Sequence, residues 1–180
     1  MNIDAFGGGT ALGGLRTQHE IRLMICYLIA NINKEIKRSH IIDALTEGEI
    51  ANYFEISSAI SEMIKDGNIK ENDEILTLSD SSFRSTKEIE NELPITLREK
   101  AVELCTKLIV KETYSKENKV EIKPTKNGFT VECSIMSDED DEALSFKLYA
   151  ATSIQAQIIK EKFLDDPVKI YNSVIEAIFE

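Results

Sequence analysis

The chain has 180 residues, carries a formal net charge of −11 and has a sequence pI of about 4.8. Its 42% hydrophobic and 29% charged residues are typical of globular proteins, and its length suffices for one large domain or two small ones. A chain this acidic repels nucleic acid as a whole, so any contact with phosphates has to come from a local patch of lysine and arginine.

The first notable stretch is GGGTALGGLR at residues 7–16, which holds five of the eight glycines. Gly9 and Gly14 have the spacing of the two glycines in a phosphate-binding loop. The lysine and the hydroxyl residue that should follow them, to reach the phosphates and the magnesium ion, are replaced by leucine and arginine. We therefore predict a flexible glycine-rich arm over residues 1–16, because glycine is costly to order.

Three helices are predicted after the arm. The sequence TQHE at residues 17–20 is a capping box, which begins a helix over about residues 18–33. Ser39 is expected to cap a short helix at residues 41–46. A third helix, with apolar residues at helical spacing, covers residues 54–65 and ends at the sequence Asp-Gly-Asn.

A small hairpin follows the third helix. Its two β-like segments, residues 69–70 and 74–79, are joined by a turn through Asn72 and Asp73. Three helices and a hairpin are the layout of a winged helix-turn-helix domain, in which the third helix enters the major groove and the hairpin is the wing. We place this domain at residues 17–92.

A connecting helix is predicted over residues 85–91, and Pro94 ends it. The sequence TLRE at residues 96–99 is a second capping box, which begins a helix that runs to about residue 112. We place the domain boundary near Pro94.

The rest of the chain predicts a sheet and two helices. Asn127 and Gly128 are a strong signal for a hairpin turn, and Thr152 opens a third capping box. The strands are predicted at residues 119–125, 128–136 and 143–150, and the helices after Thr152 and after Asp166.

The predicted fold class is α+β: a winged helix-turn-helix domain, then a domain at residues 93–180 with one helix, a three-stranded antiparallel meander and two helices. We expect this second domain to dimerise, since two half-site contacts on one duplex reinforce each other, or to sense a small-molecule effector. Its aromatic residues could line a ligand pocket, although such a set more often forms a core.

The stretches GGLRTQHEIRLMICYLIANI and ANYFEISSAISEMIKDGNI, together with LPITLREKA, ENKVEI and FLDDPVKIYNSVI, resemble an uncharacterised bacterial family. This family carries a domain-of-unknown-function label. The resemblance covers nearly the whole chain and implies a winged-helix N-terminal half, a mixed α/β C-terminal half and a role in transcription. It implies no catalytic residues.

Contact with double-stranded DNA is predicted for the outward face of the third helix and for the basic residues near it. Serine can bond to phosphates or base edges, and lysine and arginine neutralise phosphates. The predicted nucleic-acid-binding residues are Lys34, Lys37, Arg38, His40, Ser57, Ser58, Ser61, Lys65 and Lys70. Glu55 and Glu62 share the helix face and repel phosphates, so the alternative is a winged helix that docks another protein and does not bind DNA.

No catalytic centre, metal site or cofactor is predicted, and we expect no enzyme. The three cysteines are widely spaced among apolar residues, which favours buried free thiols over disulfides or structural zinc. His19 and His40 lie beside no metal-ligand or nucleophile motif, and we expect both at the surface. The acidic run at residues 137–142 lacks the glycine of a calcium loop and predicts a hydrated turn.

No apolar run in the sequence is long enough to span a membrane, and no secretory signal is evident. We therefore expect a cytoplasmic protein with no membrane partner.

Overall fold

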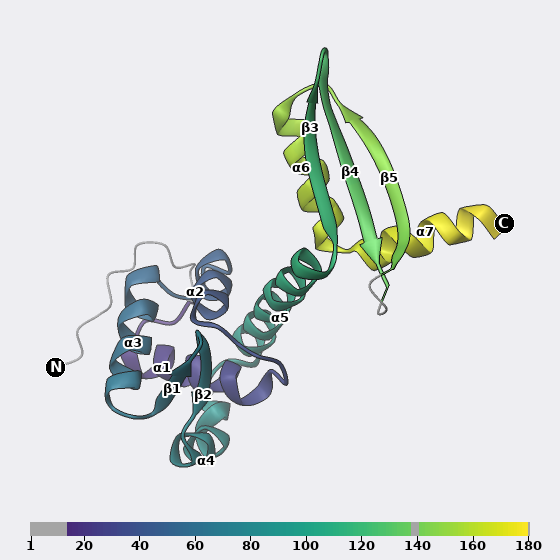
Figure 1. Cartoon of the computed structure of the whole chain (residues 1–180). Helices are drawn as coiled ribbons and strands as arrows, with labels where there is room; N and C mark the ends of the chain where they lie inside the picture. The colour runs from purple at the N-terminus through teal and green to yellow at the C-terminus, as the bar shows by residue number, and fades with distance from the viewer. Residues whose placement is uncertain (1–13, 138–140, 180) are drawn as a thin grey trace. The chain divides into compact units, whose positions relative to one another are not determined.

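The computed structural model describes residues 14–137 and 141–179 (Figure 1). The predicted arm falls largely on residues 1–13, outside the described residues. The elements are α1 (Gln18–Asn31), α2 (Arg38–Glu47), α3 (Tyr53–Lys65), β1 (Ile69–Asn72), β2 (Ile75–Leu78), α4 (Asp80–Ile89), a 3₁₀ turn (Glu90–Glu92), α5 (Ile95–Glu117), β3 (Lys119–Thr125), β4 (Gly128–Met136), β5 (Glu142–Ala150), α6 (Ser153–Asp165) and α7 (Pro167–Phe179). This is a mixed α+β fold with the predicted element order. None of the described helices combines the length and the apolar character needed to cross a membrane.

The chain divides into two compact units, unit 1 at residues 1–109 and unit 2 at residues 110–180, and each has a hydrophobic core. The division falls within α5, whereas the sequence predicted a boundary near Pro94. The reason is that Cys105 and Ile109 of α5 are buried in the core of unit 1, so this helix extends the first unit past the proline. Pro94 precedes the helix and does not separate the units.

The start of α1 confirms the first predicted capping box. Glu20 N donates to Thr17 Oγ1 at 3.1 Å, and Thr17 N donates to Glu20 Oε2 at 3.0 Å. Leu15, which the prediction placed in the arm, is only 3% exposed, and its N–H donates to the carbonyl of Ile50 at 2.8 Å. Leu15 therefore belongs to the core of unit 1.

The hairpin of unit 1 is antiparallel, with Asn72 of β1 paired to Ile75 of β2. Its turn consists of Asp73 and Glu74, which have φ angles of 49° and 68°, so it lies one residue later than predicted. Positive φ angles at both central residues are typical of a type I′ turn, whose twist matches that of the two strands of a hairpin.

The segment between α1 and α2 adds a third strand-like pairing to this hairpin. Lys37 forms an antiparallel bridge with Ile75, and Leu76 N donates to the carbonyl of Ile36 at 2.8 Å. Ile36 and Leu76 are each 2% exposed. The hairpin is therefore attached both through its own strands and through the segment that leads into α2.

Unit 2 is built on the three-stranded antiparallel meander that the sequence predicted, in the order β3-β4-β5. Along β4, Val131, Cys133 and Ile135 are buried, while Glu132 and Ser134 between them are not, so only one face of the sheet belongs to the core. Helix α6 packs against β4 and β5, and its Phe163 contacts the ring of Phe146 edge-on, with the ring centroids 5.8 Å apart.

The three cysteines are free and buried, as predicted. Burial raises the pKa of the Cys105 thiol to about 12 and that of the Cys133 thiol to about 11. It also raises the pKa of Cys26. Because the thiolate is the reactive form, these side chains are inert structural residues in the folded protein.

Candidate nucleic-acid interface

Helix α3 is amphipathic and presents one face to solvent. Ile56, Ala59, Ile60 and Met63 are buried, which fixes the orientation of the helix on α1 and α2. On the other face Ser58, Ser61, Glu62 and Lys65 are exposed, and Ser57 is half-buried. The helix starts at the Asn52 cap, whose Oδ1 accepts from Phe54 N at 2.9 Å.

Arg38 joins the start of α2 to the middle of α3. Its Nη2 donates to the carbonyl of Ser57 at 3.0 Å and to the hydroxyl of Ser61. The structure therefore brings together three residues predicted to bind DNA. Because the guanidinium already donates hydrogen bonds within unit 1, the first role of Arg38 is structural: it connects α2 to α3.

Lys37 lies at the edge of a groove of about 310 Å³ between α2, α3 and the hairpin. Its Nζ is 3.3 Å from Glu74 Oε2 in the hairpin turn. The groove is lined by Lys37, Arg38, Ser39, Ile42, Tyr53, Ser57, Glu71 and Glu74. Two carboxylates and two cations thus line this groove.

Lys34, Lys65 and Lys70 are all exposed, but they come from different places. Lys65 ends α3 and Lys70 lies in β1, whereas Lys34 belongs to the loop after α1. Within the described residues none of the three makes an ion pair. The charges of all three are therefore available to an outside partner, and Lys65 and Lys70 are the two that lie on α3 and on the hairpin.

His40 is buried, with 7% of its surface exposed, so the predicted surface position is wrong. Helix α2 begins at Arg38, earlier than predicted, and His40 is the third residue of its first turn. His40 Nδ1 accepts from Lys37 N at 3.2 Å and so caps the helix. Ser39, the predicted cap, lies within that turn.

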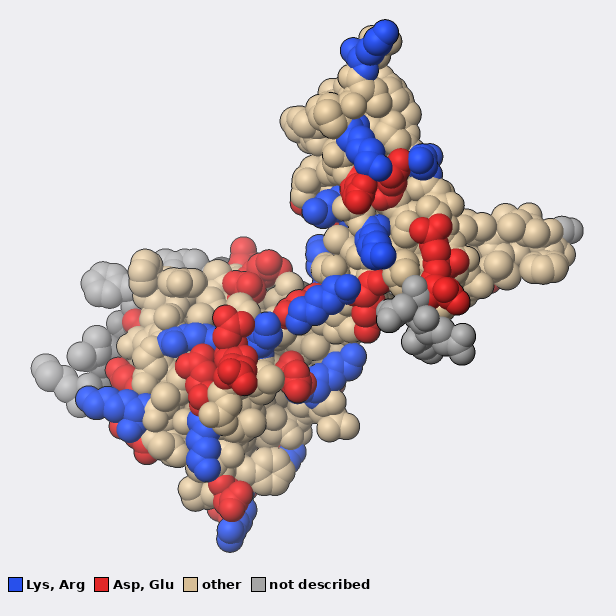
Figure 2. Space-filling model, in the orientation of Figure 1, with Lys and Arg blue, Asp and Glu red and all other residues tan. Residues whose placement is uncertain are grey.

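The surface around α3 carries carboxylates as well as cations. Arg22 on α1 pairs with Glu62 and lies 3.8 Å from Asp66, and Gln18 donates to Glu55. Figure 2 shows blue and red side chains interspersed over the visible face of unit 1, with no large blue area. The local charge thus remains mixed, as the net charge of the chain suggested.

Two exposed aromatic residues at the start of α3 were not predicted as site residues. Tyr53 is 50% and Phe54 is 76% exposed, and their rings contact each other edge-on with centroids 5.4 Å apart. The signal was present, because Phe54 lies outside the apolar stripe that begins at Ile56. Exposed aromatics of this size are typical of contact surfaces.

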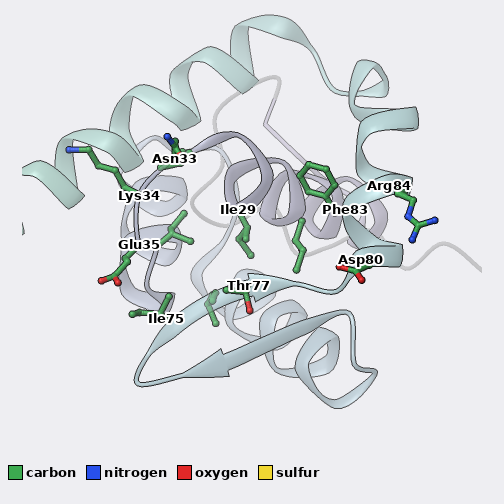
Figure 3. Close-up of a pocket in the computed structure, with 13 residues that line it drawn as sticks. Ile29, Asn33, Lys34, Glu35, Ile75, Thr77, Asp80, Phe83 and Arg84 are labelled. Carbon is green, nitrogen blue, oxygen red and sulfur yellow. The ribbon is translucent and has the colours of Figure 1, made fainter.

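A second groove, of about 710 Å³, lies between the end of α1, β2 and α4 (Figure 3). Ile29, Ile75 and Phe83 provide apolar walls, and Phe83 is 45% exposed. Lys34 and Glu35 come from the loop after α1, while Asp80 and Arg84 come from α4. The predicted residue Lys34 therefore lines a different groove from Lys37 and Arg38.

A family model described as a domain of unknown function, DUF4364, matches residues 21–178. The chain belongs to the DUF4364 family. The match runs from α1 into α7, so both units are part of the DUF4364 domain. No curated protein and no solved structure matches the chain. The resemblance to a family with a domain-of-unknown-function label is thus confirmed.

Proposed function

We propose that unit 1 is a winged helix-turn-helix domain that contacts double-stranded DNA, and that this DUF4364 protein is a transcriptional regulator. The observation that carries the proposal is the placement of α3. This helix follows α2 after a short turn at residues 48–52, exposes a serine-bearing face, and has the hairpin beside it. That arrangement leaves a helix free to enter a major groove while a hairpin contacts the backbone.

In this proposal the exposed cations position the protein and α3 reads the bases. Lys65 at the end of α3 and Lys70 in the hairpin would neutralise phosphates. Ser58 and Ser61 would face base edges, and Phe54 could contact a thymine methyl group, since apolar side chains recognise that group in the major groove.

The DNA-binding proposal is tested with the double variant Lys65→Glu, Lys70→Glu. We expect wild-type protein to bind fragmented DNA of its own host, with affinity falling as salt rises. The variant should lose on the order of 10- to 100-fold in affinity, and its salt slope should fall by about two. Fluorescence anisotropy at low and at near-physiological salt measures both quantities.

The matched control is Lys107→Glu, Lys126→Glu, which makes the same charge change at two exposed lysines, one on α5 and one in the turn between β3 and β4. It should keep the wild-type salt slope. A wild-type protein that fails to bind at low salt, where electrostatic attraction is strongest, contradicts the proposal. Equal losses in the two variants contradict the assigned surface.

The second candidate is a winged-helix module that binds another protein. It is favoured by the carboxylates on the same surface, where Glu62 pairs with Arg22 and Glu74 with Lys37. Because these carboxylates pair with cations, less positive charge is left to attract phosphates. Tyr53 and Phe54 are exposed, and exposed aromatic residues are common in protein–protein interfaces.

The variant Glu71→Lys separates the two candidates. Glu71 lines the groove between α3 and the hairpin and is exposed. If this groove approaches phosphates, reversal of its charge should raise DNA affinity several-fold and steepen the salt slope by about one. The control Glu103→Lys reverses an exposed carboxylate on α5 and should change neither quantity. Unchanged DNA affinity in Glu71→Lys favours the protein-binding candidate.

A further inference from the structure

Helix α7 carries an apolar stripe that its own unit covers only in part. Val168, Tyr171, Ile175 and Ile178 follow one another at intervals of three, four and three residues, so they lie along one side of the helix. Val168 is 49% and Ile178 is 67% exposed, and Tyr171 and Ile175 are half-buried. Phe179, beside the end of the stripe, is 83% exposed.

Helix α7 packs against the core of unit 2 through its first turns. Pro167 is the one buried residue of the helix, and Ile170 and Tyr171 pack against the core cluster of the unit. Figure 1 shows α7 continuing beyond the three-stranded sheet to the C-terminal end. The second half of the helix therefore presents apolar side chains that the described part of unit 2 leaves exposed.

The spacing of the stripe residues is the same from either end of the helix. Reversal of the helix about Ser173 exchanges Val168 with Ile178 and Tyr171 with Ile175. A pair of helices related by a two-fold axis makes this exchange, since residue i of one copy meets residue j of the other and the reverse. Heptad-like spacing of apolar residues is also what a facing helix requires. The stripe is thus complementary to its own copy in antiparallel orientation.

Charge also favours a second copy at this place. Lys169 and Glu176 are the only charged residues of α7, and at 100° per residue both fall on the side of the helix opposite the stripe. An antiparallel pair would bury no charge. The chain as a whole has a net charge of −11, so two copies repel each other except where they meet through a neutral surface such as this one.

We infer that α7 is a dimerisation helix, which pairs in antiparallel orientation with α7 of a second copy of the chain. Val168 then contacts Ile178 of the partner, and Tyr171 contacts Ile175 of the partner. Two such stripes bury on the order of 1,000 Å² in total, an area typical of weak, transient interfaces, so we expect a dissociation constant in the micromolar range. This pairing does not depend on whether unit 1 binds DNA.

The test introduces opposite charges at the two ends of the stripe. In Val168→Glu, each dimer would place two carboxylates against Ile178 of the other copy, and the protein should be monomeric. Ile178→Lys should be monomeric for the same reason. In an equimolar mixture, one antiparallel pairing sets the carboxylate introduced at position 168 of one copy against the ammonium introduced at position 178 of the other. The opposite end of that pair keeps Ile178 against Val168, so dimers should form again as heterodimers.

Sedimentation equilibrium of the full chain, at concentrations around the micromolar range, measures all three samples and the wild type. Both substituted positions are exposed, so unit 2 should stay folded, and protection of the Cys133 thiol from a thiol reagent verifies this. The control Lys169→Glu changes the outer side of α7 and should dimerise as the wild type does. A monomeric wild type, a dimeric single variant, or a mixture that stays monomeric overturns the antiparallel pairing.

Discussion

Replacement of Gly128 with alanine is expected to destabilise the protein by about 2–4 kcal/mol. A Cβ atom at this position would lie 2.5 Å from the carbonyl oxygen of Ala150 and 2.8 Å from Tyr149 Oη. The carbonyl belongs to the backbone of β5, so it can move only if the pairing of β4 with β5 shifts. Tyr149 Oη is itself held, because it donates to the carbonyl of Asn127 at 2.6 Å.

The matched control for this prediction is Gly67→Ala. Gly67 has a φ of 75°, a conformation that L residues rarely adopt, but a Cβ atom there would meet nothing within 4 Å. Only the backbone strain remains, and we expect a cost of about 1 kcal/mol. Urea denaturation of the two variants and the wild type compares the free energies of unfolding. Equal losses would mean that the close approach at Gly128 relaxes freely.

Replacement of Phe163 with alanine is expected to cost about 3–5 kcal/mol. The ring of Phe163 is 2% exposed and lies between α6 and the apolar face of the sheet, where it contacts Phe146. The core of unit 2 has few buried side chains, so removal of this ring takes away a large part of its packing. The loss is therefore a large share of the stability of a small unit.

The effect of Phe163→Ala should be confined to unit 2, because the two hydrophobic clusters share no residue. The buried thiols report on each unit separately, since Cys26 and Cys105 belong to the core of unit 1 and Cys133 to that of unit 2. In the variant, a thiol reagent should label Cys133 faster while the other two stay protected, as mass spectrometry of the peptides would show. Equal acceleration at all three thiols would indicate that the units unfold together.

The helices and strands of the chain were predictable from local signals, and the exact turns were not. Apolar periodicity and capping residues placed α1, α3, α6 and α7, and alternation placed β3 to β5. The turn predicted at Asn127 and Gly128 lies at Lys126 and Asn127, since Thr125 pairs with Gly128. Several turn sequences satisfy the same local rules, and strand register is decided by which side chains reach the core.

Two other boundaries depended on contacts far along the chain. The second predicted capping box has Thr96 inside α5, because the helix begins at Ile95 directly after the proline. Pro94 alone could not reveal the unit boundary, because the burial of Cys105 and Ile109 in unit 1 depends on tertiary contacts. Local sequence shows that an apolar stripe exists and leaves open which core it joins.

The candidate site was predictable in outline only. The pattern of apolar residues indicated the outward face of α3, and with it Ser58, Ser61 and Lys65. It could not show that Arg38 bonds to Ser57 and Ser61, because those contacts join residues far apart in the sequence. His40 was misplaced for a related reason: a histidine next to a helix start can cap it from within, and composition does not reveal the direction of its ring.

The bridge between Lys37 and Ile75 has a consequence for the order in which unit 1 can fold. The hairpin itself closes over two residues, whereas the bridge closes a loop of about forty residues that encloses α2, α3 and β1. The entropic cost of that loop is much lower once the enclosed helices are formed and packed. We therefore expect the helices and the hairpin of unit 1 to form first. The contact between Ile36 and Leu76 should form late, so its formation would limit the folding rate of unit 1.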